Sequence, residues 1–486
     1  MRDGVTLATD VYLPEGTGPF PTLLERTPYG RRRCDQSEQI TGAATPPERA
    51  EVVARTLDEG FAVIVQDCRG SGASGGRFDK YTQEPDDSAD TIAWAKAQPW
   101  CGPLRTTGFS YGAMWQLCAL AKDDHGIDAA FIDCGGFYDA FASALRQGGA
   151  LDLKQATWAM AQAARESQEK PADADTVFTH LMRGPWGPGD APLADDSPYL
   201  NALNAFWQNA TRSPFWDHPA FHAARTIAAS LGTPAFFVTS WHDTSLVNVV
   251  SAFAARARLG EREQSLIIGP WSHGNRHLTH AGEADFGEEA LPEVGLGATF
   301  QDLRLAFLAR PRAPTGPPVR VFVMGGGTGR RNEDGRIDHG GRWHSAPSWP
   351  PAHKERVLSL GPAGLGERAP SAPFSHTFIS DPHLPVPTLG GAINSGEPVM
   401  AGGMFDHTTL FPVADGESGR ADVLSFLTAP LAEDLVIAGP VSAHLWVSAE
   451  VADCDVTIKL IDVYPGDGPA LNLCDGILRL RFRDGF

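Results

Sequence analysis

The chain has 486 residues, of which 42% are hydrophobic and 20% are charged. This length exceeds one ordinary hydrophobic core, so we expect two or three domains in a globular protein. The net charge of -19 argues against nucleic acid and anionic membrane surfaces as partners, since both are also negative. The sequence has no apolar run of about eighteen residues and no basic-then-apolar start, so we expect neither a membrane span nor a secretory signal.

The cysteines are scattered singly, without a Cys-x-x-Cys pair: Cys34, Cys68, Cys101, Cys118, Cys134, Cys454 and Cys474. Single thiols in odd number predict a reduced, cytoplasmic protein with buried cysteines. His218 and His222 form one histidine group and His273, His277 and His280 another, but neither has an evident acidic or thiolate partner. We therefore expect no metal site and no cofactor.

Segments typical of strands and helices alternate from the first residues to about residue 135. The run 61–66 is apolar almost throughout, which is typical of a parallel strand buried on both faces. The strand-like segments are 5–12, 21–26, 61–66, 104–107 and 129–133, and the helix-like segments are 87–97 and 113–120. Strands that alternate with helices predict a doubly wound α/β sheet.

Strand signals fade between residues 137 and 228, where Ala, Gln, Trp and Leu dominate and a turn cluster occupies 184–189. They resume at 234–238 and 265–268. A helical insert within an α/β sheet is the usual origin of a lid over an active site, and the tryptophans of this insert favour that interpretation. A helical layer that only stabilises the sheet is the alternative.

A Pro- and Gly-rich stretch at 311–318 predicts a linker, and short β-rich segments follow it. These segments are 319–324, 357–360, 422–427, 441–447, 456–463 and 477–482. Their spacing predicts a β-sandwich, interrupted by a long excursion at 342–373. Because the chain stops at Phe486, directly after a strand-like segment, we expect the sandwich to be incomplete.

The most informative motif is the Gly-x-Ser-x-Gly pentapeptide at 108–112, which lies between a predicted strand and a predicted helix. Such a turn strains the serine backbone and exposes the Ser110 hydroxyl, and a Cβ at either glycine would collide with neighbouring elements. The next backbone N–H lies at a helix N-terminus, where it can stabilise an oxyanion. An ordinary Gly/Ser turn is the alternative if the motif stands alone.

A serine nucleophile needs a base and an acid that orients the base. In α/β hydrolases these residues follow in the order Ser, then Asp or Glu, then His, each on a loop after a strand. The strand at 234–238 runs into Asp243, and the strand at 265–268 runs into His273. Each residue alone is more often structural, as a helix cap or a packed histidine. The ordered triple with Ser110 predicts a catalytic triad.

Long motifs stand in order along nearly the whole chain: Met1–Tyr12, Arg26–Tyr29, Asp67–Gly76, Gln98–Cys101 with Gly108–Gln116, Gly269–His273 and Arg420–Leu431. Together they resemble the cocaine esterase and X-Pro dipeptidyl-peptidase group, the CocE/NonD hydrolases, which includes the α-amino acid ester hydrolases. The resemblance implies an α/β-hydrolase fold with a helical lid and a C-terminal jelly-roll β-sandwich of the galactose-binding-like type. The implied domains are a catalytic domain at 1–136 and 229–312, a helical cap at 137–228 and the jelly roll at 313–486.

The resemblance also implies a role for each site residue. Ser110 would be the nucleophile, His273 the base and Asp243 its orienter. The Tyr29 hydroxyl and the Tyr111 backbone N–H would form the oxyanion hole, where one such donor contributes roughly 3 kcal/mol in the transition state. Without the resemblance, Tyr29 is interpreted as a turn aromatic after a proline.

The loop that holds the acid departs from the family, because it reads Ser-Trp-His-Asp at 240–243 where the family more often has Gly-Trp-Tyr-Asp. We expect His242 to be a partly exposed loop histidine, although it could alter the pocket and its specificity. The arginine run at 31–33 could bind an anion, but a solvated loop is the preferred interpretation. The Gly-rich loop at 67–76 is expected to be structural.

The expected reaction is acyl transfer to water through an acyl-enzyme, with an ester of a small or aromatic acyl group as the first choice. The alternative is an X-Pro dipeptidyl-peptidase, or an α-amino acid ester hydrolase and β-lactam acylase, either of which needs a carboxylate for the substrate's amino group. Asp139, Asp152 and Glu166 are candidates by position only. A non-catalytic binding protein is disfavoured because all triad positions are filled.

Three aromatic residues of the insert, Phe141, Trp158 and Trp186, could line an apolar acyl pocket, although aromatics at helical spacing usually pack in a core. We expect a small-molecule ester, an amide or a short peptide as the substrate. Neither nucleic acid nor membrane is expected as a partner, and a homo-oligomer stays open.

Overall fold

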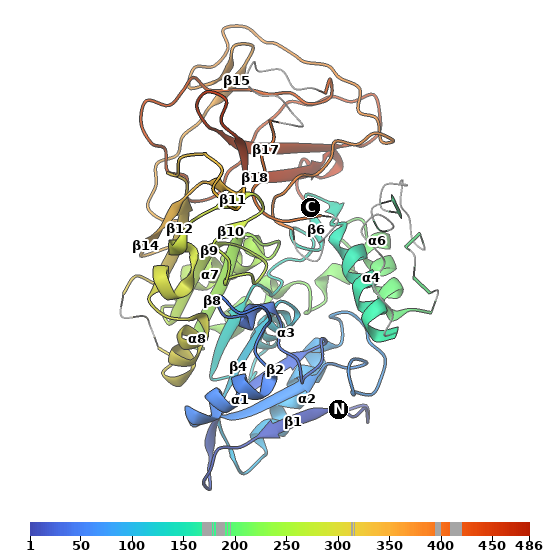
Figure 1. Ribbon diagram of the computed structural model, residues 1–486. Coiled ribbons are helices and arrows are strands. Elements are labelled where there is room, and N and C mark those ends of the chain that lie inside the picture. Colours follow the sequence, from blue (N-terminus) through green and yellow to red (C-terminus); the bar gives the residue numbers. More distant parts are fainter. Residues whose placement is uncertain are drawn as a thin grey trace.

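The computed structural model describes residues 1–167, 177, 179–180, 190–191, 193–194, 196–312, 314, 316–393, 400–408 and 420–486. Its described part contains a nine-stranded sheet in the order β1-β3-β2-β4-β5-β8-β9-β12-β14 (Figure 1). The strands are β1 (Thr9–Tyr12), β2 (Phe20–Thr27), β3 (Ala62–Asp67), β4 (Cys101–Phe109), β5 (Ala129–Asp133), β8 (Ala235–His242), β9 (Gln264–Ser272), β12 (Val319–Met324) and β14 (Gly341–Ala346). The strands from β3 to β12 are parallel, and β1 and β14 pair antiparallel at the two edges.

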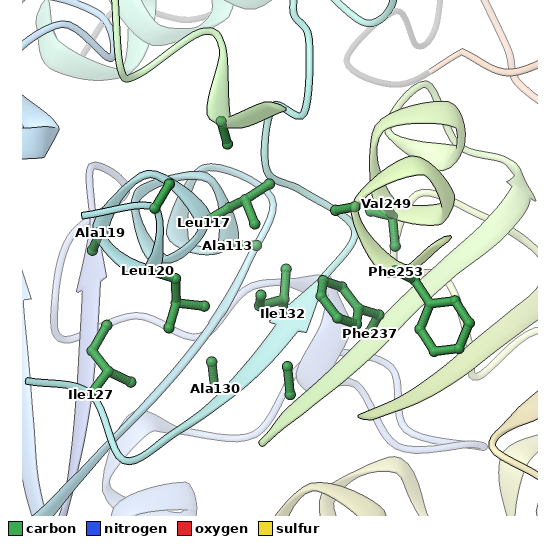
Figure 2. Close-up of a cluster of buried hydrophobic side chains, with 14 of the residues drawn as sticks. Ala113, Leu117, Ala119, Leu120, Ile127, Ala130, Ile132, Phe237, Val249 and Phe253 are labelled. Carbon is green, nitrogen blue, oxygen red and sulfur yellow. The ribbon is translucent and has the colours of Figure 1, made fainter. Parts of the chain in front are cut away.

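Helices cover both faces of this sheet, because successive side chains of a strand point to opposite faces and both are apolar here. The helices are α1 (Arg49–Asp58), α2 (Glu84–Lys96), α3 (Tyr111–Leu120), α7 (Leu246–Arg258) and α8 (Phe300–Ala309). In β5, Ile132 belongs to the core under α2, α3 and α7, whereas Phe131 packs on Phe300 and Phe307 of α8. Figure 2 shows Ile132 and Phe237 between α3 and α7. This architecture confirms the predicted α/β-hydrolase-type fold.

Strand β12 corrects one expectation, because residues 319–324 were assigned to the C-terminal sandwich. Val319 and Val321 are fully buried and pair parallel with Leu266 and Ile268 of β9. The strand therefore continues the central sheet beyond the Pro-rich stretch, and β14 pairs on its outer side. The strand joins this sheet because its valines become buried there and because it pairs the backbone N–H and C=O groups at the edge of β9.

The described residues between β5 and β8 form an insert. It contains a short hairpin, β6 (Arg146–Gln147) with β7 (Ala150–Leu151), the helices α4 (Lys154–Ser167) and α6 (Pro198–Gln208), and the 3-10 turns η2 (Pro214–Asp217), η3 (Ala223–Arg225) and η4 (Ile227–Ser230). Its centre is aromatic, with the Trp216 ring in contact with the rings of Phe141, Phe206 and Phe221. The predicted turn cluster at 184–189, including Trp186, lies outside the described residues.

The described part of the C-terminal region forms fewer strands than the sequence predicts. The structure describes two hairpins there, β15 (Ser359–Gly361) with β16 (Gly364–Gly366) and β17 (Asp455–Val463) with β18 (Ala470–Arg479). The segments 422–427 and 441–447 are not strands, and residues 477–482 end in the 3-10 turn η7 (Leu480–Phe482). An extended segment becomes a strand only when a neighbour completes its hydrogen-bond ladder, and that partner is a property of the tertiary fold.

Strand β18 lies on the insert, beside the β6–β7 hairpin (Figure 1). The Arg479 N–H donates to the Gly148 carbonyl at 2.8 Å, and a Cβ on Gly148 would lie 1.7 Å from the Ile477 carbonyl oxygen. The Phe482 ring packs on Phe141 with 5.6 Å between centroids. The C-terminal region thus stabilises the insert by direct contact.

Short elements complete the described chain. They are the turn η1 (Gln36–Glu38), the small sheet β10 (His280–Ala281), β11 (Ala284–Asp285) and β13 (Ile337–Asp338), the 3-10 turn η5 (Glu288–Ala290) and the π-helical turn η6 (Pro292–Leu296). Within the residues that the structure describes, no helix combines the length and apolarity that crossing a bilayer requires.

Candidate active site

The predicted serine turn is a sharp elbow between β4 and α3. Ser110 has φ of 57° and ψ of -113°, a sparsely populated conformation that stores strain. A Cβ on Gly108 would lie 2.5 Å from the Gly112 carbonyl oxygen, and a Cβ on Gly112 would lie 3.1 Å from the Arg26 carbonyl oxygen. Both flanking glycines are therefore needed for the elbow to close.

The three predicted triad residues lie together. Asp243 directly follows β8 and His273 directly follows β9, so parallel strands bring both to the edge of the sheet that carries Ser110. The distance from His273 Nε2 to Ser110 Oγ is 2.9 Å, and that from His273 Nδ1 to Asp243 Oδ2 is 2.6 Å. This is a continuous hydrogen-bond relay from a carboxylate through an imidazole to a hydroxyl.

The carboxyl group of Asp243 is buried yet held as an anion. Burial alone raises its pKa, but the charge and hydrogen bond of His273, the Ser245 N–H at 2.6 Å and the Cys134 thiol together lower the pKa to about 2. Burial, together with the charges of Asp243 and Asp133, raises the pKa of the Cys134 thiol well above its usual value. Cys134 therefore stays protonated and donates to the carboxylate.

Among the described residues, Cys134, Asp243 and His273 are also the one group of three whose donor atoms lie close enough for a metal ion, within 4.8 Å of one another. Both ring nitrogens of His273 are already engaged by Ser110 and Asp243. A metal ion would therefore have to displace the relay.

Tyr29 and Tyr111 lie beside the nucleophile in different ways. The Tyr29 hydroxyl accepts a hydrogen bond from the Trp158 indole N–H at 3.4 Å. Burial raises the pKa of Tyr29, and hydrogen bonds with Trp158 and Ser110 partly offset the rise, so the hydroxyl keeps its proton. The Tyr111 hydroxyl instead donates to Glu84 Oε1 at 3.1 Å. Tyr111 is the first residue of α3, where backbone N–H groups have no partner within the helix.

A cavity of about 40 Å³ adjoins the nucleophile. Its lining residues are Tyr29, Lys80, Tyr81, Ser110, Tyr111, Met114, Cys134, Gly135, Gly136, Phe137, Ala144, Leu145, Lys154, Gln155, Trp158 and Ser245. Four of the non-glycine lining residues, Tyr81, Ser110, Cys134 and Ala144, have positive φ angles, and Asp124 is the one other non-glycine residue in the described chain that does. Backbone strain concentrates at functional sites, so these residues favour the cavity as the candidate active site.

The predicted pocket aromatics divide into three cases. Trp158 lines the cavity, Phe141 lies in the aromatic core of the insert, and Trp186 is outside the described residues.

The three candidate carboxylates for an amino group do not line the cavity. Asp139 binds the Arg212 guanidinium through both oxygens, at 2.8 and 2.9 Å. Asp152 accepts from the Lys154 backbone N–H, and Glu166 is exposed near the end of α4.

Lys80 and Lys154 are lining residues that the sequence interpretation missed. Lys80 comes four residues after the Gly-rich 67–76 loop, and Lys154 begins α4. A single lysine does not form a motif. The one signal that could have indicated Lys80 and Lys154 is that neighbouring segments follow the ends of strands.

His242 corrects a second expectation, because it is 1% exposed rather than a partly exposed loop residue. It ends β8 and stacks on Phe286, with 6.3 Å between ring centroids. Burial, with a smaller contribution from the charge of His339, lowers the pKa of His242 to about 3. The imidazole is therefore neutral, and it is not among the residues that line the cavity.

The arginine run at 31–33 is only partly solvated. Arg31 binds Asp67 Oδ2 at 2.8 Å and Asp10 Oδ1 at 2.9 Å, whereas Arg32 and Arg33 are exposed. Asp67 also accepts the backbone N–H groups of Arg31 and Ala73 and so holds the Gly-rich loop. This loop is a structural turn.

Comparison with known proteins agrees with this geometry. Residues 3–275 match the family "X-Pro dipeptidyl-peptidase (S15 family)". The chain belongs to this S15 family. It is therefore a serine hydrolase, of a family whose members act on ester or peptide substrates. Residues 312–486 match the family's "X-Pro dipeptidyl-peptidase C-terminal non-catalytic domain".

Individual relatives span the whole chain. A cocaine esterase of Rhodococcus sp. (strain MB1 Bresler) is 30% identical over all of this chain and 82% of its own length. Two solved structures share the fold at 22% identity, each matching all of this chain and 81% of its own. One is an α-amino acid ester hydrolase (TM-score 0.70), and the other is an aminopeptidase from a marine sediment archaeon, Thaumarchaeota archaeon (TM-score 0.72).

Proposed function

We propose that this S15-family chain is a carboxylic ester hydrolase with Ser110 as nucleophile, His273 as base and Asp243 as orienting acid. The observation that carries the proposal is the relay of hydrogen bonds from Asp243 through His273 to Ser110, of 2.6 and 2.9 Å. The anionic Asp243 favours the positive charge that His273 gains when it takes the Ser110 proton.

The reaction then runs in two halves. Ser110 Oγ bonds to the ester carbonyl carbon while its proton moves to His273, and His273 gives that proton to the alkoxide as the C–O bond breaks. Water attacks the acyl-enzyme, its proton moves to His273, and that proton returns to Ser110 as the carboxylic acid leaves. No other reactant is needed.

The Tyr29 hydroxyl and the Tyr111 N–H form the oxyanion hole in this proposal. Tyr29 supports it because its protonated hydroxyl interacts with Ser110 and lines the same cavity. Tyr111 supports it because its N–H begins α3, where the helix dipole favours negative charge. Both donors are held by surrounding contacts before the substrate arrives, which is what makes such stabilisation effective.

The cavity lining favours an ester over an X-Pro peptide. A peptidase that reads a free amino terminus needs a carboxylate beside the ammonium group. Among the described lining residues there is no Asp or Glu, and two lysines are present instead. The volume of about 40 Å³ also favours a small acyl group over an aromatic one.

We further propose that residues 137–228 form a lid on the catalytic domain of 1–136 and 229–312, and that 313–486 is a jelly-roll domain apart from β12 and β14. The match of 312–486 to the family's C-terminal domain supports the last assignment. Seven free cysteines support a cytoplasmic location.

The direct test compares a p-nitrophenyl ester with Gly-Pro p-nitroanilide, using wild type and Ser110→Ala. We expect wild type to hydrolyse the ester and the variant to lose at least about a thousandfold in kcat, since removal of the nucleophile has costs of that order or more. Cleavage of the anilide in preference to the ester would establish the peptidase instead. Ester turnover that survives Ser110→Ala would overturn the proposal.

A further inference from the structure

Two lysines lie inside the cavity beside the nucleophile, although lysine is rarely buried in a protein. Lys80 is 3% exposed and Lys154 is 8% exposed. The cavity is therefore basic, whereas the chain as a whole carries a net charge of -19. Burial lowers the pKa values of both lysines, so their charge depends on what binds beside them.

The Lys80 ammonium group has few polar partners. It donates to Gln155 Oε1 at 2.9 Å and lies 3.4 Å from the centroid of the Trp158 ring. Within the part of the chain that the structure describes, Lys80 forms no ion pair with a carboxylate. An ammonium group has three donors, and a buried charge costs stability unless it is paired. Lys80 can therefore still bind an anion.

Lys154 adds a second positive group on the same side. Its ammonium donates to the Thr244 hydroxyl, next to Asp243 in the chain. Burial and the charge of Lys154 lower the pKa of Lys80 well below its usual value, with Asp152 acting in the opposite direction. An anion bound in the cavity would raise that pKa again, so binding of the anion and protonation of Lys80 favour each other.

The position of the cavity shows which part of a substrate would enter it. His273, which gives a proton to the leaving group, is not among the described residues that line the cavity, whereas Tyr29 and Ser110 are. The cavity therefore lies on the acyl side of the nucleophile. Its volume of about 40 Å³ has room for roughly three water-sized groups, which limits the acyl chain to a short one.

We propose that the acyl pocket binds a free carboxylate through the Lys80 ammonium group, and that the substrates are monoesters of short dicarboxylic acids. This inference rests on the proposed function, because it assigns the acyl group that Ser110 attacks. The same lysines repel an ammonium group, so the pocket discriminates against α-amino acyl and dipeptidyl substrates by charge.

The test uses the full chain and three ethyl esters of similar size. They are monoethyl succinate, the neutral shape-match ethyl 4-methylpentanoate and the cationic ethyl 3-aminopropanoate, followed by ethanol release near pH 7.5. We expect kcat/KM to fall in that order. Lys80→Met should lower kcat/KM for monoethyl succinate at least tenfold and leave the neutral ester within about threefold, because only the carboxylate loses a charge-assisted hydrogen bond.

Matched variants separate charge from folding. Lys96→Met removes an exposed lysine of α2 and should change none of the three rates. Lys80→Gln serves if Lys80→Met does not fold, and succinate itself should inhibit hydrolysis of the neutral ester by wild type competitively. A wild type that prefers the neutral ester, or a Lys80 variant that keeps the full preference for monoethyl succinate, would overturn the inference while Ser110-dependent ester hydrolysis remains intact.

Discussion

At the scale of single residues, the site depends on groups whose protonation is fixed by their surroundings. The buried Asp243 stays anionic through His273, and the buried Tyr29 keeps its proton through desolvation. One group therefore stabilises positive charge on the imidazole and the other can donate to negative charge on the substrate. Ser110, Asp243 and His273 were predictable because their order and strand-end positions are written in the sequence. Lys80 was not, because its burial is created by the insert.

Tyr29→Phe tests the oxyanion role at this scale. We expect kcat for ester hydrolysis to fall about 100- to 1000-fold with KM changed little, because removal of one oxyanion donor has that effect in other serine hydrolases. Steady-state kinetics with the p-nitrophenyl ester measures it. Tyr12→Phe, on strand β1 away from the cavity, is the matched control and should be neutral. A Tyr29→Phe enzyme with wild-type kcat would exclude the hydroxyl from the mechanism.

At the scale of elements, hydrophobic pattern predicted the strands that are buried on both faces. All six residues of β3 are buried, and the apolar run at 61–66 predicted this strand. The pattern failed where pairing decides the outcome. Residues 319–324 look like any short strand, and only the open edge of β9 determines that they belong to the central sheet. Residues 441–447 have a similar composition, but they pair with no strand in the described structure.

The end of strand β8 gives a prediction of pH dependence. His242 has a pKa of about 3 in the folded protein, because burial disfavours its charged form, whereas an unfolded histidine titrates near its usual value of about 6.5. Between these values the unfolded chain binds the extra proton, so stability is present above about pH 6.5 and is lost as the pH falls toward 3. In this window, His242→Phe should reduce the slope of the free energy of unfolding against pH by up to about 1.4 kcal/mol per pH unit.

Urea unfolding at several pH values between 7 and 4 measures that slope. Phenylalanine suits the site because the imidazole stacks on Phe286. His344→Phe, at an exposed position of β14, is the control and should leave the slope unchanged. An unchanged slope in His242→Phe would mean that the imidazole is not held neutral by burial.

At the scale of the whole molecule, the proposed catalytic groups from four distant segments meet at one edge of the sheet. Tyr29 follows β2, Ser110 follows β4, Asp243 follows β8 and His273 follows β9. The parallel sheet aligns these strand ends, the insert supplies Trp158 and Lys154, and β18 packs against the insert. The strand-end part of the site could be predicted from motifs and chain order. The cavity beside Ser110 could not, because residues of the insert complete its lining.

The central claim is that Ser110 is activated by this relay. The most direct measurement is stoichiometric labelling with a p-nitrophenyl phosphonate, followed by mass spectrometry of the intact chain and its peptides. The account predicts one phosphonyl group per chain, located on Ser110, with labelling at least about a hundredfold slower in His273→Ala. Labelling at another residue, or equally fast labelling of Ser110 without His273, would contradict it.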